Sequence, residues 1–153
     1  MDAGSPERQA RIEALGGRLA DRLLDRERRR SRPYDLWFTY HLYHKAPDWL
    51  GPTVARGLAI PYVVTEASVA TKRRDGPYSR GYRASVAALG AASLVIGLNP
   101  ADRAGVEPHL TADAAYRDLP PFLDARHFRE ASTSRRQARK ALTALFPDSV
   151  PAD

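Results

Sequence analysis

Three short apolar runs, each followed by polar residues, constrain the fold of this chain more than any other feature. The runs are Asp35–Tyr40, Ile60–Thr65 and Ser93–Leu98. The segments between them, about Asp48–Ala59 and Ser79–Ala92, are each long enough for one helix. This alternation predicts an α/β, Rossmann-like fold, in which right-handed βαβ units build a parallel sheet with flanking helices.

Polar side chains follow each predicted strand. His41, His44 and Lys45 follow the first run; Glu66, Ser68, Lys72 and Arg73 follow the second; Asn99 and Asp102 follow the third. Ligands of open parallel sheets bind outside the carboxyl ends of the strands. We therefore expect His41, His44, Glu66 and Asn99 to line one edge of the sheet, together with the loop at Lys72–Arg74.

Helices are also predicted outside the three strands. In Ser5–Arg30, Ser5 is a suitable N-cap and Pro6 a suitable first residue. Its predicted buried face is Ile12, Leu15, Leu19 and Leu23, widened by Ala20 and Leu24, and its arginine-rich end is expected to be a solvated turn. A helix at Ala101–Leu110 and a short apolar run at Tyr116–Leu123 follow the third strand.

The domain boundaries follow from these elements. Residues 1–125 form the predicted domain, with a leading helix at 1–31 and βαβ units at 32–125. Residues 126–153 form a linker and the start of a further domain, with an amphipathic helix expected at Arg126–Leu145.

Composition restricts the remaining choices. The 153 residues suit about one domain, and the lack of cysteine excludes disulfides and cysteine-ligated metals. No apolar run approaches the ~18 residues of a membrane span, and the N-terminus lacks the apolar core of a signal peptide, which favours a cytoplasmic protein. The formal charge of +6 indicates an anionic partner: a nucleotide, a nucleic acid or a membrane surface.

Several segments resemble, in order and spacing, the N-terminal domain of retaining GT-B glycosyltransferases of family GT4. Ile60–Glu66 is similar to the family's PxVxTxH-like strand, and Leu94–Asp102 to the strand that follows it. Asp118–Phe128 matches the Pro, Asp and Phe spacing of the segment that crosses to the second domain. Phe38–Asp48 and Glu66–Ser68 look like the corresponding segments of a bacterial subgroup of glycosyltransferases. The resemblance covers roughly residues 32–128.

The chain departs from that family in three respects. It has no opening strand with a glycine-rich loop, it has no second domain with an E-x7-E pair, and it carries Glu66 where many members have histidine. The first two departures lead us to expect a fragment or truncated product. We expect such a chain to be inactive and only marginally stable by itself.

The resemblance implies transfer of a sugar from a nucleotide-sugar donor, with retention, to a sugar or lipid-linked acceptor. This domain would shape the acceptor side, and a missing C-terminal domain or partner chain would hold the nucleotide. The implied catalytic residues are His41, His44 and Glu66; the implied substrate-binding residues are Tyr40, Lys45, Ser68, Lys72, Arg73 and Asn99. Neither a metal nor a cofactor is expected, and peripheral membrane contact fits the basic charge.

Each of these residues also has a structural interpretation. His41 and His44 fit ordinary loop or packing roles, and their spacing does not suit two metal ligands on one face. Glu66 either pairs with Lys72 or Arg73 or faces the cleft. The basic loop is either solvated or binds phosphate, Asn99 and Asp102 fit helix capping, and Asp124 fits a turn toward the second domain.

Two other classes of function stay open. The charge and the arginine clusters suit a basic nucleic-acid-binding module, but no alternation of aromatic and basic residues and no zinc-ligand or helix-turn-helix signature supports it. No specific nucleic acid is therefore expected. The chain also fits a non-catalytic subunit of a split glycosyltransferase.

Overall fold

The computed structural model describes residues 5–30, 34–120, 126 and 135–146. Within them, four strands form one sheet: β1 (Trp37–Tyr40), β2 (Tyr62–Thr65), β3 (Leu94–Gly97) and β4 (Ala115–Asp118). The sheet order is β1-β2-β3-β4 and every neighbouring pair is parallel. The predicted parallel α/β architecture is confirmed, including the pairing of the second and third apolar runs.

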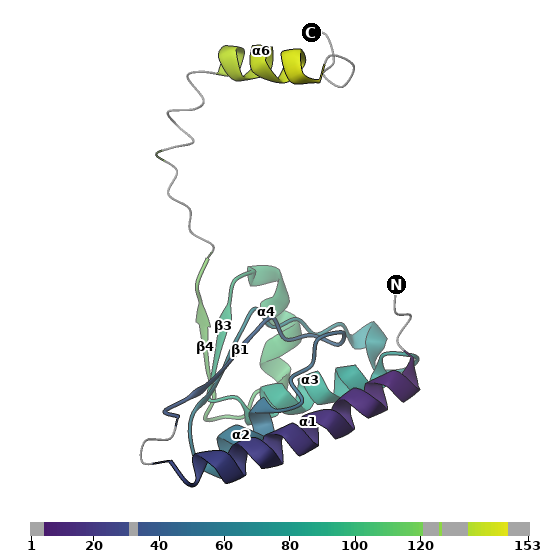
Figure 1. Ribbon diagram of the computed structural model, residues 1–153, viewed down its shortest axis with the longest axis vertical. Helices are drawn as coiled ribbons and strands as arrows, with labels where there is room; N and C mark the ends of the chain where they lie inside the picture. The colour runs from purple at the N-terminus through teal and green to yellow at the C-terminus, as the bar shows by residue number, and fades with distance from the viewer. Residues whose placement is uncertain (1–4, 31–33, 121–125, 127–134, 147–153) are drawn as a thin grey trace. The chain divides into compact units, whose positions relative to one another are not determined.

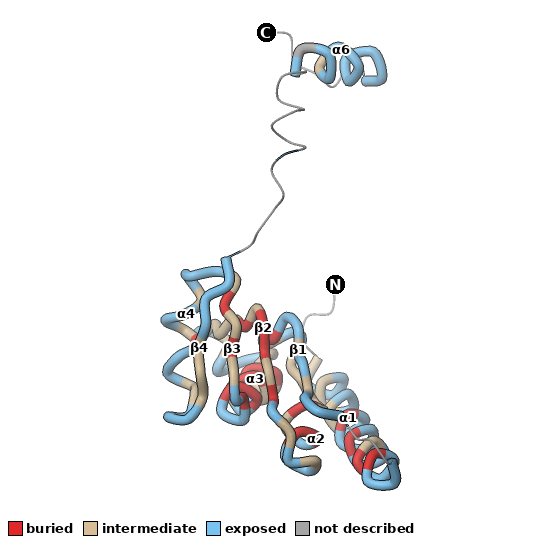
Figure 2. The backbone as a smooth tube through the Cα atoms, turned by 90° about the vertical axis from the view of Figure 1, so that its left-hand side faces the viewer, coloured by how far each residue is buried: buried red, intermediate tan, exposed pale blue. Residues whose placement is uncertain are grey.

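The helices between the strands all lie on one face of the sheet. They are α2 (Gly51–Leu58), α3 (Ser79–Ala91) and α4 (Pro100–Val106), with short 3-10 turns η1 (Thr71–Arg73) and η2 (Glu107–His109). Because the strands are laid down in chain order, successive crossovers of the same hand must fall on the same side. Figure 1 shows the helices on one side of the strands, and in Figure 2 β2 and β3 stand in front of α3.

The opposite face of the sheet is not covered by any element of the described 5–120 segment. Phe38 and Tyr40 on this face are 54% and 63% exposed. Across the sheet, Phe38 lies beside Val63, and Val63 lies beside Leu94. Parallel sheets are usually buried on both faces. Here one face stays open, because no crossover among the described residues reverses direction to place a helix on this side.

The core fills the space between the sheet and the helices. Tyr62, Val64 and Val95 project into it from the strands. The remaining buried members of this cluster are Leu42, Ala55, Ala67, Ala88, Leu89, Ala92 and Val106. Trp37 packs against this cluster and also against a second one formed by Ala20, Leu24 and Val54, so it joins the two.

The long N-terminal helix α1 (Pro6–Glu27) packs across α2 and α3. Ser5 is its N-cap, with a side-chain oxygen that accepts from the Arg8 N–H at 3.3 Å, as predicted. The predicted apolar face is wrong in part, because Ile12, Leu15 and Leu19 are exposed.

Small residues set the buried face of α1 instead. Gly16 and Ala20 are buried there, followed by Leu24 one turn later. A side chain at Gly16 would collide with Trp49, and one at Gly57 of α2 would lie 2.7 Å from a methyl group of Leu24. Close helix approach, rather than the largest side chains, therefore determines which face is buried.

The end of α1 is not simply a solvated basic turn. Glu27 is buried, and its Oε1 accepts from Nε of Arg26 at 3.0 Å and from a terminal nitrogen of Arg30 at 3.2 Å. Since a buried carboxylate without a partner is costly, these arginines have a structural role that the sequence interpretation missed.

The second compact unit is described here only through Arg126 and residues 135–146. It contains α6 (Arg135–Leu145), whose Leu142 and Leu145 are exposed. This confirms the C-terminal half of the predicted amphipathic helix. The turn predicted at Asp124 lies outside the described residues. Among the described helices, none combines the length and apolar character needed to cross a membrane.

Adjacent valines of β2 test the difference between the two faces of the sheet. Val64 is fully buried on the helix side, whereas Val63 is half-buried on the open side. We expect Val64→Ala to lower the free energy of unfolding by about 2 kcal/mol, because it leaves a cavity in the core, and Val63→Ala by less than about half of that. Urea denaturation of both variants measures this; equal losses would mean that the open face is covered in solution.

Candidate functional site

Two residues at the carboxyl edge of the sheet have an unusual backbone. His41 and Glu66 directly follow the last residues of β1 and β2, Tyr40 and Thr65, which are partners in register. Their φ angles are 66° and 54°, in the left-handed region that residues other than glycine rarely adopt. The N–H of His41 donates to the Thr65 carbonyl at 2.9 Å, and the N–H of Glu66 to the Ile96 carbonyl at 3.0 Å. Hydrogen bonds of the sheet thus hold both residues in place at the points where the chain leaves β1 and β2.

The side chains of these two residues meet. Nδ1 of His41 lies 3.3 Å from Oε2 of Glu66. The Tyr40 hydroxyl and then the His41 imidazole stabilise the carboxylate and lower the pKa of Glu66. The same contact raises the pKa of Tyr40. Oε2 of Glu66 is shielded from solvent, and the described residues give it no well-aligned hydrogen bond.

A continuous row of rings extends from this pair along the edge. The centroid distances are 5.9 Å for Tyr40–His41, 4.9 Å for His41–Tyr43, 5.3 Å for Tyr43–His44 and 5.2 Å for His44–Tyr78. The last three contacts are edge-to-face, a favourable arrangement of aromatic rings. The row brings both predicted histidines to one surface, as expected.

At the far end of the row, Tyr78 is contacted by two cations. The Lys45 ammonium lies 5.5 Å from its ring centroid and the Arg73 guanidinium 5.6 Å. Burial, and then the charges of Arg73 and Lys45, lower the pKa of His44. A cavity of about 230 Å³ lies beside His44, Lys45 and Tyr78, with the first part of α1 on its other side.

The other predicted residues are less closely associated with the histidines. Asn99 caps α4, because its side-chain oxygen accepts from the Ala101 N–H at 3.1 Å; its capping interpretation is therefore confirmed. Ser68 contributes a backbone N–H that donates to the Leu42 carbonyl at 2.9 Å. Lys72 is exposed on η1. Glu66 contacts Tyr40 and His41, so of its two expected arrangements the pairing with Lys72 or Arg73 is not the one adopted.

The sequence interpretation missed Asp48, whose carboxylate accepts five hydrogen bonds. Oδ2 accepts from the indole of Trp37 at 3.0 Å, from the Tyr62 hydroxyl at 3.0 Å, and from Thr39. Oδ1 accepts from two backbone N–H groups at the start of α2, those of Leu50 at 2.9 Å and Gly51 at 2.7 Å. An aspartate shortly before a Gly-Pro helix start was the available signal for this cap.

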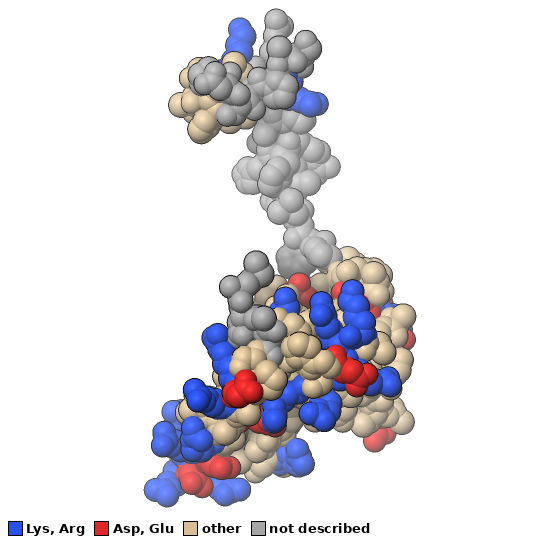
Figure 3. All heavy atoms as spheres, turned by 90° about the vertical axis from the view of Figure 1, so that its right-hand side faces the viewer, with Lys and Arg blue, Asp and Glu red and all other residues tan. Residues whose placement is uncertain are grey.

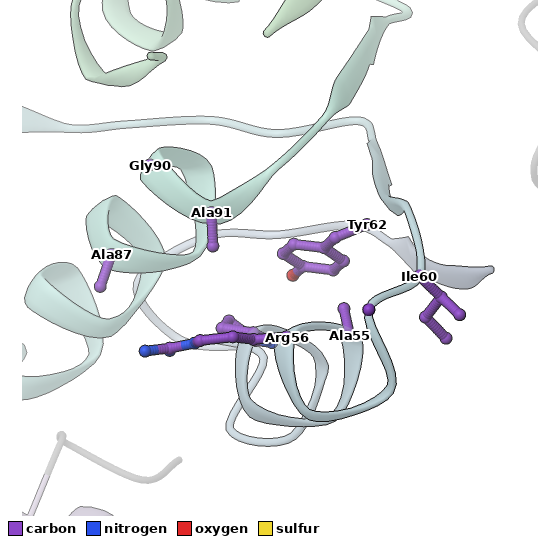
Figure 4. A pocket seen from close by; sticks show the side chains of 9 residues that line it. Ala55, Arg56, Ile60, Tyr62, Ala87, Gly90 and Ala91 are labelled. Carbon is purple, nitrogen blue, oxygen red and sulfur yellow. The ribbon is translucent and has the colours of Figure 1, made fainter. Parts of the chain in front are cut away.

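A cavity of about 500 Å³ at the amino ends of the strands contains none of the predicted site residues. It lies between α2 and α3, and Figure 4 shows the Tyr62 ring and the Arg56 side chain beside it, with small side chains such as Ala55, Ala87 and Ala91. Its lining offers little acid–base chemistry, since the Tyr62 hydroxyl already donates to Asp48.

Among the described residues, no group of three histidine, aspartate or glutamate side chains is placed to hold a metal ion. Comparisons of the chain with protein-family models, with curated proteins and with solved structures found no match. The description of the site therefore depends on the geometry of this chain alone.

Replacement of Asp48 tests its structural role. Asp48→Asn keeps the size of the side chain but places an amide among donors that need an acceptor, so we expect a loss of about 2–4 kcal/mol in the free energy of unfolding. Asp75→Asn, in the exposed loop before α3, is the matched control and should change it by less than about 0.5 kcal/mol. Chemical denaturation compares the two; a small loss for Asp48→Asn would contradict the role given to this residue.

The lowered pKa of His44 predicts a pH dependence of stability. Below its ordinary pKa of 6.5, the unfolded chain binds a proton at this position that the folded chain does not bind. Stability should therefore fall as the pH drops from about 6.5 toward the folded-state pKa, with no contribution from this group at higher pH. In His44→Gln that part of the decline should disappear. Melting temperatures between about pH 8 and pH 5 measure it, with His109→Gln as the control; parallel curves would contradict the prediction.

Proposed function

We propose that this chain is the acceptor-side half of a glycosyltransferase that transfers a sugar from a nucleotide-sugar donor with retention. The observation that carries the proposal is the contact between His41 and Glu66 at neighbouring strand ends. A carboxylate on Nδ1 orients the imidazole and leaves Nε2 available to a hydroxyl group of the substrate. Since His41 is half-exposed, an acceptor sugar can reach it.

The surroundings of the pair also suit a carbohydrate. Tyr40 is 63% exposed and lies directly beside both residues, so its ring offers a flat surface for the apolar side of a sugar. The Glu66 carboxylate, on a side chain that is 35% exposed, can accept a hydrogen bond from a second hydroxyl. Two adjacent polar contacts and one aromatic face are a common composition for a specific small-molecule site.

The donor side of such an enzyme requires a second wall. Transfer depends on groups that stabilise the leaving nucleotide in the transition state, and the residues along this edge of the sheet supply only the acceptor side. The proposal therefore includes binding of an acceptor without turnover by this chain alone. The resemblance of Ile60–Glu66 and Leu94–Asp102 to GT4 segments supports the choice of reaction, and a non-catalytic subunit of a split enzyme would use the same surface.

The charge distribution does not favour a nucleic-acid-binding module. Figure 3 shows Lys and Arg side chains in several separate groups on the helix-bearing side, with Asp and Glu between them. Several of the arginines have acidic partners, as Arg80 has in Glu13 and Arg103 in Glu107 and Asp118. A protein that binds the phosphate backbone of a nucleic acid usually has a continuous basic stripe along the path of that backbone.

Binding of sugars to the purified chain tests this proposal. We expect ligand-observed NMR with a panel of mono- and disaccharides to detect binding that His41→Gln and Glu66→Gln each weaken roughly tenfold or more, through loss of one charged hydrogen bond. His109→Gln, which replaces a histidine away from this edge, is the control. We expect no turnover of UDP- or GDP-sugars.

The outcomes separate the alternatives. Sugar binding that is unchanged in both variants, or no sugar binding at all, would overturn the acceptor site. Turnover by the isolated chain would overturn the division into two halves. Tight binding of DNA or RNA with a steep dependence on salt would instead favour the nucleic-acid-binding module.

A further inference from the structure

Beside the proposed acceptor site, three nitrogen-bearing side chains surround one tyrosine. His44 packs edge-to-face on Tyr78 at 5.2 Å, and the cationic groups of Lys45 and Arg73 lie 5.5 Å and 5.6 Å from the centroid of the same ring. We name these four residues the Tyr78 cluster. They come from three segments, the loop after β1, the turn η1 and the residue before α3, so only the fold brings them together.

The cluster contains nitrogen atoms that lack hydrogen-bond partners among the described residues. Nε of Arg73 and Nε2 of His44 are both shielded from solvent and unpaired. No described carboxylate forms a salt bridge with Arg73 or with Lys45. Buried polar groups are normally satisfied, and an unpaired guanidinium nitrogen is among the costlier exceptions. The arrangement is what a site for an acceptor-rich anion requires.

The electrostatic surroundings favour an anion as well. Lys72 and Arg74 flank Arg73 in the sequence, and both are exposed. Tyr78 directly precedes α3, so the positive end of this 13-residue helix adds to the field of the side chains. The packing of the segment is tight here, because a side chain at Gly81 would collide with the His44 carbonyl. The cationic groups are therefore held on a rigid support.

A cavity of about 230 Å³, lined in part by His44, Lys45 and Tyr78, gives such an anion a place to bind. Arg73 does not line this cavity, but its guanidinium lies 5.6 Å from the centroid of the Tyr78 ring that borders it. We propose that the Tyr78 cluster binds a phosphate group, with Arg73 and Lys45 as its charged contacts and His44 as a hydrogen-bonding contact. Guanidinium groups suit phosphate because they donate two parallel hydrogen bonds, and an ammonium group adds a compact charge. This goes beyond the proposed acceptor site, because the contacts with the phosphate come from residues other than His41 and Glu66.

Titration calorimetry with pyrophosphate at constant ionic strength tests the proposal. We expect saturable binding that Arg73→Gln and Lys45→Gln each weaken roughly tenfold or more. The matched control is Arg74→Gln, which removes the same charge from an exposed neighbour and should change affinity by less than about threefold. Arg73→Lys should retain part of the affinity for pyrophosphate, because it keeps the positive charge. This result would show that the charge of the side chain, and not its packing, determines the affinity.

A second arm identifies where the phosphate comes from. The assay is sedimentation with vesicles of phosphatidic acid and phosphatidylcholine. If the phosphate belongs to a lipid headgroup, the vesicles should carry down the unmodified chain and the Arg74→Gln variant, but not Arg73→Gln. If the ligand is soluble, the chain should bind pyrophosphate and not the vesicles. Either result supports the site when Arg73→Gln abolishes it selectively.

Three results would overturn the proposal: no saturable binding of either probe, equal weakening by Arg73→Gln and Arg74→Gln, or loss of the folded state in Arg73→Lys. His41→Gln distinguishes this site from the acceptor site, because it should leave pyrophosphate affinity unchanged. The failure of sugar binding would therefore not count against the phosphate site, and the reverse also holds.

Discussion

The Asp48 carboxylate joins the parts of the molecule on which the site depends. It accepts hydrogen bonds from β1 through Trp37, from β2 through Tyr62, and from the start of α2 through the Gly51 N–H. Hydrogen bonds to an ionised acceptor are stronger than neutral ones. A side chain at Gly51 would collide with Asp48 and Trp37, so glycine is required at this position. Both ends of the segment between β1 and α2 are thereby anchored, and this segment carries His41, His44 and Lys45.

The same constraint explains why polar chemistry gathers at the carboxyl edge. Parallel strands end together, and in this sheet two neighbouring strands end at residues with left-handed backbone, His41 and Glu66. Such conformations cost free energy and persist only where the surroundings hold them. Here the ladder hydrogen bonds to Thr65 and Ile96 supply that support. A strained backbone on both members of a contacting pair favours a functional role over a packing role.

Much of this arrangement was predictable. Residues such as Val64 and Val95 made the strands recognisable, and the order of strands and helices led directly to the parallel sheet. The common edge of His41, His44 and Glu66 followed from strand direction alone. The partner of Glu66 was not predictable, because it depends on the left-handed backbone of His41 and Glu66, which local sequence patterns do not reveal. Asp48 was missed because its donors are distant in the sequence or belong to the backbone.

The sequence by itself determined the first three strands, the helices between them and the parallel direction of these strands, since these depend on local patterns and on the handedness of crossovers. It showed β4 only as part of an apolar run and not as a strand. It did not determine which face of α1 is buried, because the fit of Gly16 against Trp49 outweighs the larger apolar side chains. Nor did it show that the face with Phe38 is left open, which follows from the sheet order. Only the tertiary structure placed His44, Lys45 and Arg73 around Tyr78, because contacts between separate segments depend on how the elements pack.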